Sequence, residues 1–564
     1  MKINYIHIGI LLMAAQSTLA APPVGSAIPL FQIPPAPIQR NEAPKIEIDR
    51  PTTPPPSAVA DTKTIRVNEI QIRGEKVYEE SELIALTGFV PGSDLTLTDL
   101  RFMTVKIADF YRERGYFLAQ AYLPAQTIKN GVVTITVIVG EYGNVTINNQ
   151  TRLSDGIANN LISGLDSGDL IESGPLETRL LLLSDVPGVI VNSTLVPGST
   201  PGTSDLNVDL TPGPLVSGSI EGDNAGLPAT GAFRLGATVN INNLAGLGDV
   251  ASLRVLSSGP GMTYGRASYQ IQAGRGTVGV AYTQINYALG KQYSDLGIHG
   301  SAKIASVYGS YPLIRSRATN LYAQLGLDSR AYQENFDSAD DIVYPKTTDK
   351  HANVLMPGIY GDHRDSFGGG GLTSYGAVWS FGNLNIQTAA ARAIDSRSQG
   401  PKTNGAYNKL AFNGMRLQNV MDTPFSLYGA VNGQIASKNL NIWEKMELGG
   451  MYGVRAYPAG TAFGDQGYIV NLEVRYLLPA WSAPIPGRVS LIALYDTGSV
   501  IYNKNPLEAG NNTVTLNGAG VGLTWADLNN FTVKGYYAHK IGNTPATLNT
   551  SATGQFWIQL VKYF

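Results

Sequence analysis

The sequence predicts a mainly β protein, in which a 16-stranded antiparallel transmembrane β-barrel follows two small repeats of β-α-α-β-β order. Three observations favour this fold class: an export signal begins the chain, residues 214–564 alternate between apolar and polar side chains, and glycine-rich turns separate the alternating segments. After the signal, no stretch reaches the roughly 18 to 20 apolar residues that a spanning helix needs. Backbone polar groups find no water inside a bilayer, so such an exported chain enters a membrane as a closed barrel.

Composition limits the classes of function. The chain has 564 residues, of which 43% are hydrophobic and 15% charged, so several folded modules are expected. It contains no cysteine, which excludes disulfides and cysteine metal sites. A net charge of -2 and a pI near 6.3 argue against nucleic acid as a partner, because such partners call for a concentrated basic surface.

Residues 1–20 are typical of a signal peptide, with a positive Lys2, an apolar run over 8–15 and a small-residue cleavage site that ends at Ala20. The mature protein is therefore expected to leave the cytoplasm. Residues 21–63 are rich in proline, which lacks a backbone donor and favours an extended linker. A short plug around residues 38–49 is the alternative for this region.

Two copies of one pattern follow, over residues 64–141 and 142–213. In the first copy, the alternating strand "IRVNEIQIRG" precedes two helices and two further strands, "LAQAYL" and "GVVTITVIVG". Thr98 and Asp99 are the cap residues expected for the longer helix. Apolar residues at helical spacing form the inward face of that helix: Leu100, Met103, Ile107 and Phe110.

Residues 214–564 are expected to form the barrel. The segment "NLYAQLGLDSR" (320–330) places leucines on one face and Gln324, Asp328 and Arg330 on the other, as lipid on one side and a wet lumen on the other require. Tyrosine and tryptophan cluster near segment ends, as in a membrane-interface girdle. Sixteen segments are predicted, near 215–223, 233–244, 249–258, 264–273, 277–289, 300–311, 319–333, 371–381, 384–394, 406–418, 425–438, 466–478, 488–497, 514–526, 531–541 and 555–564.

The connections between these segments differ in length. Tight turns are predicted at 274–276, 382–383 and 527–530, and long loops at 334–370 and 439–465, which barrels of this kind place in the periplasm and outside the cell respectively. The chain closes on Phe564, an aromatic terminal signal for barrel insertion. Lys562 interrupts the outward apolar row, and near a rim its side chain can reach water.

The two repeats resemble POTRA domains, and a POTRA pair followed by a 16-stranded barrel resembles the outer-membrane transporters of two-partner secretion, the ShlB/FhaC/HecB family of the BamA superfamily. The resemblance covers about residues 64–564. Its sharpest parts are "VRAYP" (454–458), similar to the VRGY/F motif of loop six, and "LYDTG" (494–498), similar to the FxDxG motif of strand thirteen. Val454, Tyr457 and Gly498 match these motifs, whereas Ala456 and Leu494 depart from them.

Arg455 falls between the eleventh and twelfth predicted strands, and Asp496 lies on the thirteenth, in phase with a lumen-facing Ser490. The resemblance implies that the two meet and lock an inward-folded loop to the barrel wall. An arginine presents a planar fork that matches a carboxylate, which a lysine does not reproduce. The alternative is a solvated loop arginine unrelated to Asp496.

The resemblance also implies a function. POTRA domains capture an unfolded client in the periplasm, by strand addition to an unpaired sheet edge, and the client passes through the lumen to the cell surface. The implied client is a large β-helical exoprotein, an adhesin or cytolysin, and the other implied partners are outer-membrane lipid and the barrel-assembly machinery. Candidate client contacts in the first repeat are Phe102, Ile107, Phe110 and Tyr111, for which ordinary core packing is the alternative.

No phosphate loop, GxSxG or HExxH motif is present, the five histidines are scattered, and neither catalysis nor a cofactor or metal is expected. "YGDHRD" (360–365) and "GGGG" (368–371) are interpreted as loop. Two other functions remain open. A BamA-like assembly factor commonly carries three to five POTRA domains, whereas this chain has room for two. The second is a passive porin. Such transporters share its channel activity, but a porin needs no periplasmic binding repeats, so the two repeats argue against it.

Overall fold

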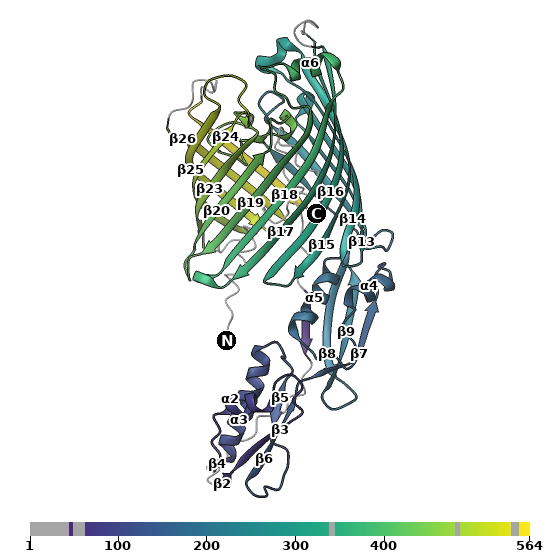
Figure 1. Cartoon of the computed structure of the whole chain (residues 1–564), viewed down its shortest axis with the longest axis vertical. Coiled ribbons are helices and arrows are strands. Elements are labelled where there is room, and N and C mark those ends of the chain that lie inside the picture. Colours follow the sequence, from purple (N-terminus) through teal and green to yellow (C-terminus); the bar gives the residue numbers. More distant parts are fainter. Residues whose placement is uncertain (1–43, 49–62, 338–344, 480–485, 529, 543–551) are drawn as a thin grey trace. The chain divides into compact units, whose positions relative to one another are not determined.

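The computed structural model describes residues 44–48, 63–337, 345–479, 486–528, 530–542 and 552–564. The described chain forms two compact units, one within Asn41–Gly213 and the other within Pro214–Phe564 (Figure 1). The predicted signal peptide and most of the proline-rich linker lie outside the described residues. Across the part of the chain that the structure describes, no helix combines the length and the apolar character needed to cross a membrane.

The first repeat folds around helix α3 (Leu97–Glu113). Its elements are β2 (Thr64–Val67), β3 (Glu69–Arg73), α2 (Glu80–Thr87), β4 (Ser93–Thr96), α3, β5 (Gln120–Tyr122) and β6 (Val132–Ile138). Strands β3, β6 and β5 form one sheet in that order, and β2 pairs with β4. The apolar face predicted for α3 is buried in the core that the helices share with this sheet.

The start of α3 differs from the prediction. Its N-cap is Thr96, whose side-chain oxygen accepts a hydrogen bond from the Asp99 backbone at 3.1 Å, while the Asp99 carboxylate accepts one from the Thr96 backbone at 2.9 Å. This reciprocal capping box needs a cap three residues before the acid, so Thr98 lies inside the helix instead. Asp99 was correctly assigned to the helix start.

The second repeat contains β7 (Glu141–Asn149), α4 (Asp155–Ile162), α5 (Ser173–Ser184), β8 (Val189–Pro197) and β9 (Thr203–Pro212). Its sheet has a fourth strand that the sequence analysis did not predict. Strand β1 (Lys45–Ile48) comes from the predicted linker and pairs in parallel with β8, in the order β1-β8-β9-β7. The described part of the suggested plug is therefore a strand, and the β8 edge is paired rather than open.

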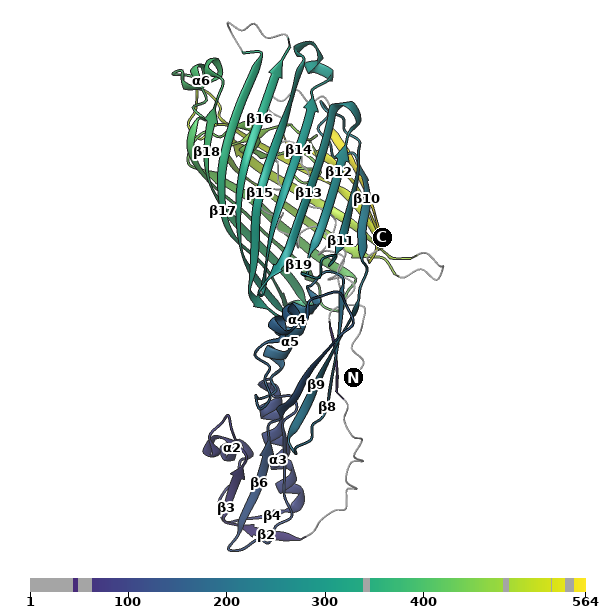
Figure 2. The same ribbon diagram turned by 90° about the vertical axis from the view of Figure 1, so that its right-hand side faces the viewer.

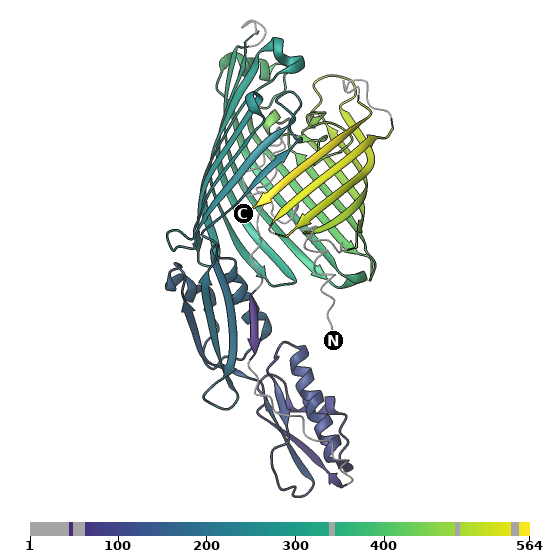
Figure 3. The ribbon, with the colours of Figure 1, turned by 180° about the vertical axis from the view of Figure 1, so that it is seen from behind.

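The barrel is a closed ring of sixteen antiparallel strands, in which β10 pairs with β27, and this confirms the predicted fold class (Figures 2 and 3). Closure removes every free sheet edge. The strands in order are β10 (Val216–Asp223), β11 (Arg234–Asn242), β12 (Val250–Ser257), β13 (Met262–Ala273), β14 (Gly276–Ala288), β15 (Ile298–Arg315), β16 (Thr319–Phe336), β17 (Thr347–Asp365), β18 (Gly371–Ile386), β19 (Gly405–Asn419), β20 (Phe425–Ala436), β23 (Gln466–Leu477), β24 (Arg488–Ile501), β25 (Thr513–Asp527), β26 (Phe531–Lys540) and β27 (Gly554–Tyr563).

The predicted number of strands is correct because two errors cancel. Most of the long loop predicted at 334–370 is strand β17, so "YGDHRD" lies in a strand. Strand β18 runs straight through the turn predicted at 382–383, and the strand predicted at 384–394 is instead the end of β18 and helix α6 (Ala389–Ser396). Gly382 faces the ring of Tyr407, where an added Cβ would lie 2.2 Å from the ring, so it provides room within the sheet rather than a turn.

The predicted alternation of faces is confirmed. Leu325 and Leu327 on β16 are each 51% exposed on the outer face, whereas Asp328 and Arg330 are buried. The tight turns after β13 and β25 occur as predicted. At the chain end, the Phe564 backbone exchanges hydrogen bonds with Gly218 at 3.1 and 2.9 Å, which ties it to the first strand.

Candidate functional site

The connection between β20 and β23, residues 437–465, is folded into the barrel. It contains η6 (Ile442–Glu444) and the short strands β21 (Met446–Glu447) and β22 (Phe463–Gly464), which pair with each other. Its middle is apolar and buried, in one cluster with side chains of β24 and β27 such as Leu494 and Trp557. We call this connection loop six; its burial is expected only if it lies against the inner wall.

The structure brings Arg455 and Asp496 together. The Arg455 Nε and Nη2 atoms donate to the two carboxylate oxygens of Asp496 at 2.8 and 2.7 Å, and the Arg455 backbone donates to the same carboxylate at 3.0 Å. Asp496 is 0% exposed and Arg455 is 4% exposed. This is the bidentate geometry in which the planar guanidinium fork matches a carboxylate.

A second carboxylate, which the sequence analysis did not connect with Arg455, completes the cluster. Glu473 on β23 accepts from Arg455 Nη1 at 2.5 Å and from Arg475 Nε at 2.7 Å, so two arginines face two carboxylates. Glu473 and Arg475 alternate with apolar residues along the segment 466–478, which places them on its polar face, but periodicity carries no information on which residues of different strands meet.

Two aromatic residues contact Arg455, one at its guanidinium and one at its backbone. Its Cζ atom lies 4.9 Å from the centroid of the Tyr536 ring, a cation–π contact, and the Arg455 carbonyl accepts a hydrogen bond from Trp557 Nε1 at 2.7 Å. Burial lowers the pKa of Arg455, but the hydrogen bonds to Asp496 and the charge of Glu473 raise that pKa above its ordinary value. Arginine is not deprotonated in proteins, so the guanidinium is charged, as the pairing with two carboxylates requires.

The other motif residues pack around this pair. Val454 and Tyr457 are 0% and 1% exposed, and the Lys540 Nζ atom lies 5.0 Å from the centroid of the Tyr457 ring. Gly498 faces loop six, where an added Cβ would lie 2.6 Å from Leu448 Cδ1. The glycine of the motif thus lets the loop approach the wall closely.

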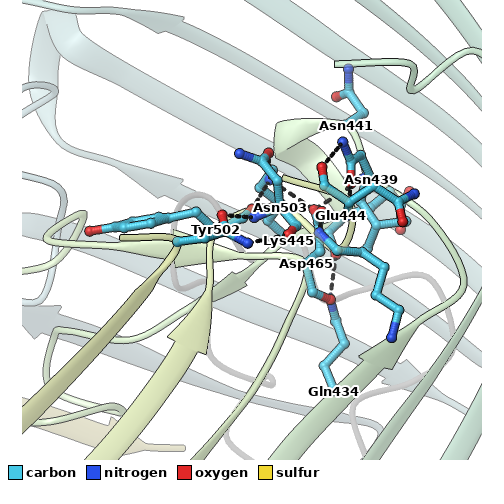
Figure 4. Close-up of polar contacts among 12 residues, drawn as sticks. Gln434, Asn439, Asn441, Glu444, Lys445, Asp465, Tyr502 and Asn503 are labelled. Atoms are coloured by element: carbon cyan, nitrogen blue, oxygen red, sulfur yellow. Dashed lines mark hydrogen bonds and ion pairs between the residues drawn. The ribbon is translucent and has the colours of Figure 1, made fainter. Parts of the chain in front are cut away.

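The base of loop six is held by a separate polar network (Figure 4). Lys445 Nζ and Asp465 Oδ1 form an ion pair at 2.8 Å, and the same Asp465 oxygen accepts from the Leu440 backbone at 3.0 Å. Gln434 Nε2 donates to the Glu444 and Asp465 carbonyls, both at 2.9 Å. These contacts join the two ends of the loop to each other and to β20.

The candidate client contacts on α3 divide into two groups. Ile107, Phe110 and Tyr111 are 0%, 8% and 0% exposed and belong to the core of the first repeat. Phe102 is 60% exposed, with Lys106 Nζ 5.0 Å from its ring centroid. Only Phe102 of the four is available on the surface of the folded repeat.

Nothing among the described residues gathers three or more potential metal ligands. His363 of "YGDHRD" accepts or donates a single 2.8 Å hydrogen bond with Thr319 on the neighbouring strand. The motif is therefore part of the barrel wall near the strand end.

Comparisons with known proteins agree with this architecture. A family model described as haemolysin secretion/activation protein ShlB/FhaC/HecB matches residues 202–525, and one described as POTRA domain, ShlB-type, matches residues 65–140. The chain is 29% identical over 511 residues to the heme/hemopexin transporter protein HuxB of Haemophilus influenzae, which covers 88% of this chain and 87% of the relative. It is 23% identical over 470 residues to the outer membrane transporter CdiB of Dickeya dadantii, which covers 82% of this chain and 80% of the relative.

Two solved structures share the fold. CdiB from Escherichia coli superposes with a TM-score of 0.68 at 20% identity, over 91% of this chain and 93% of that chain. BamA from Haemophilus ducreyi, lacking POTRA domains 1–3, superposes with a TM-score of 0.53 at 14% identity, over 89% of this chain and 100% of that chain.

Proposed function

Because the chain belongs to the haemolysin secretion/activation protein family ShlB/FhaC/HecB, we propose that loop six is the gate of its channel and that Arg455 and Asp496 are the lock of this gate. The chain is an outer-membrane transporter of two-partner secretion, with its POTRA domains in the periplasm. The observation that carries the proposal is the bidentate, buried contact between the loop arginine and the wall aspartate.

The energetics of the pair suit a lock. Removing one partner of a buried ion pair costs about 3 to 5 kcal/mol, because the other charge is left uncompensated in a poorly hydrated site. An exposed pair contributes only about 0 to 1 kcal/mol. Arg455 therefore holds the loop against thermal motion, and a passing client has to replace or hydrate its partners.

Client capture is proposed to take place at the POTRA domains through strand addition, in which backbone hydrogen bonds bind an extended chain whatever its sequence. The pairing of β1 with β8 supports this mode, because it shows that the β8 edge accepts a further strand. Since β1 occupies that edge, a client strand would have to take its place there. Phe102 on α3 is the proposed apolar contact in the first repeat.

The proposed client is a large β-helical exoprotein that crosses the lumen unfolded and folds at the cell surface. Folding outside would favour outward movement without nucleotide hydrolysis, and we propose that the transporter itself catalyses no reaction. The proposed identity of the client can be tested by examining the neighbouring gene. We expect that gene to encode a very long exported β-helical protein with an N-terminal secretion domain. Loss of the transporter should remove that one exoprotein from the medium, whereas loss of an assembly factor depletes many barrels.

The lock is tested by replacing Arg455 and, separately, Asp496 with alanine and measuring the exoprotein released into the medium. Both variants should assemble as heat-modifiable barrels and secrete poorly, because a loop freed only at Arg455 stays in the lumen without a fixed position. Arg275→Ala is the matched control, because this arginine is exposed in the tight turn between β13 and β14. Full secretion by both lock variants would reject the proposal.

A further inference from the structure

Loop six makes a second set of buried contacts that the proposed lock does not include. These contacts are made by Trp443 and Glu444 of η6, which are 2% and 3% exposed. Glu444 lies eleven residues before Arg455 in the chain. A buried indole and a buried carboxylate in this short helical turn need polar partners, because an unpaired buried charge is strongly unfavourable. Both side chains therefore have partners on the barrel wall.

The Glu444 carboxylate pairs with two cations of the wall. One oxygen accepts from Arg330 Nη1 on β16, and the other lies 2.8 Å from Lys409 Nζ on β19. Lys409 also donates to the Glu444 carbonyl at 3.1 Å, so it binds both the side chain and the backbone of this residue. Arg330 directs its remaining nitrogens to Asp328, with Nη2 at 2.8 Å.

These four groups form a balanced cluster of two cations and two carboxylates. Asp328 and Arg330 belong to one strand and stay paired whatever the loop does. Among the described residues, Lys409 in contrast pairs with a carboxylate only on the loop. Removal of Glu444 would leave the wall with a net positive charge in a confined space, so the wall electrostatically favours the docked loop.

The neighbouring Trp443 adds an apolar contact to the same wall. Its ring stacks on Tyr332 of β16 with centroids 5.2 Å apart at 16°, and meets Tyr287 of β14 edge-on at 5.8 Å. Its Nε1 atom donates to Glu334 Oε1 at 3.2 Å. Such aromatic pairs contribute beyond their buried area, and the indole N–H has the acceptor that burial requires.

The two sets of contacts are on different parts of the wall. Arg455 binds residues of β23 and β24, whereas Trp443 and Glu444 bind residues of β14, β16 and β19. In the ring, β20 lies between β19, which binds Glu444, and β23, which binds Arg455, whereas β14 and β16 lie further around the ring from β23. Loop six is therefore attached to the wall at two separated places along its length.

We infer that Glu444, with Trp443, forms a second anchor of loop six, and that opening the channel requires release of this anchor as well as of Arg455. Glu444 is a positioning residue in this mechanism: it holds the first limb of the loop against β16 and β19 and is not required to touch the client. This inference rests on the proposed gate function of loop six. Release at Arg455 alone would free the tip and leave the first limb inside the lumen.

The test uses the full-length transporter in outer membranes and a reporter cysteine, which is unique because the chain has none. Met451→Cys is suitable, because Met451 is 5% exposed and lies between the two anchors in sequence. The rate at which a bulky maleimide-polyethylene glycol labels this cysteine reports withdrawal of the loop. The reporter is combined with Glu444→Gln, with Arg455→Gln and with both, and heat-modifiable migration shows that each barrel is assembled.

We expect Glu444→Gln to raise the labelling rate at least tenfold, and the double variant to show about the product of the two single effects. Lys409→Gln removes the same ion pair from the wall side and should also raise the rate. Glu508→Gln, an exposed carboxylate in the next connection, is the matched control and should label at the native rate.

Native labelling rates in both Glu444→Gln and Lys409→Gln, together with a raised rate in Arg455→Gln, would overturn the second anchor and leave the first lock intact. If Glu444→Gln does not assemble, Lys409→Gln alone decides between these outcomes. A raised labelling rate with unchanged secretion would retain the anchor but reject loop six as the gate. The labelling experiment can therefore reject the second anchor, and the secretion assay the gate function of loop six, independently of each other.

Discussion

The methyl group of Ala456 lies against the bare backbone of Gly518 on β25: a Cβ added at position 518 would be 2.4 Å from the Ala456 Cβ. The family motif has glycine where this chain has Ala456, so the larger loop residue is accommodated by a glycine in the wall. Such close packing tolerates no added carbon without movement of the backbone. The fit of loop six thus depends on the two positions together.

Gly518→Ala should push loop six away from the wall and reduce secretion several-fold, because overpacking of this kind costs about 1 to 3 kcal/mol. Ala456→Gly in the same chain should restore secretion, since it removes the carbon that clashes. Exoprotein in the medium measures both. A double variant as defective as Gly518→Ala would show that this contact does not control the loop.

Arg455→Lys should be nearly as defective as Arg455→Ala, although it retains the charge. A lysine has one nitrogen, whereas Arg455 uses three nitrogens on two carboxylates. Loss of this geometry in a buried cluster costs on the order of 3 kcal/mol. Protection of loop six from protease added to intact cells is the measurement, and native protection in the lysine variant would contradict the need for the fork.

Thr96→Ala should lower the free energy of unfolding of the first repeat by about 1 kcal/mol, the usual contribution of an N-cap threonine. Thr98→Ala, two residues later on the exposed face of the same helix, is the matched control and should be neutral. Thermal unfolding of the full-length protein, monitored through hydrogen exchange of the α3 amides, distinguishes the effects of the two substitutions. Equal effects would contradict the capping box.

The contribution of this capping box should depend on pH. The hydrogen bonds from the Thr96 side chain and backbone lower the pKa of Asp99 below its ordinary value of 3.8. A carboxylate whose pKa is lowered by folding stabilises the fold above its unfolded-state pKa, and this contribution is lost as the pH falls through the folded-state pKa. The stability difference between native and Asp99→Asn protein should therefore be constant near neutral pH and shrink below about pH 4.

Ile46→Asp should detach β1 from the second repeat, because Ile46 packs against the core of that repeat. Amide hydrogen exchange should then accelerate along the β8 residues that pair with β1, 192–195. Glu47→Gln, an exposed change in the same strand, should leave exchange unaltered. If strand addition captures the client, Ile46→Asp should also bind unfolded client more tightly; weaker binding would contradict replacement of β1 at this edge.

Phe102→Ala should weaken client binding without destabilising the first repeat, because its ring is mostly exposed. Ile107→Ala should instead destabilise the repeat by about 2 to 5 kcal/mol, since it removes a fully buried side chain and leaves a cavity. Thermal unfolding and client binding, measured on the same two proteins, separate a surface contact from a core residue. Unchanged binding by Phe102→Ala would remove it from the proposed contact site.

The sequence by itself determined the barrel and the faces of its strands, whereas the strand number came out right only because two local errors cancelled. Lipid outside the barrel and water inside it impose a two-residue alternation of apolar and polar side chains that is visible in the sequence. Leu325 on the outer face and Asp328 on the inner face are examples. The resemblance of the motifs around Arg455 and Asp496 to those of a known family also identified one pair.

Tertiary structure alone decided which strands meet and which residues share a cluster. Glycine and proline mark a turn in one context and a close approach within a sheet in another, so β17 and β18 were misplaced. The partners of Glu473, Glu444 and Gly518 are set by the register of the strands around the closed ring and by the path of loop six through it. A local period cannot encode such contacts, because they depend on ring closure between segments that are far apart in the chain.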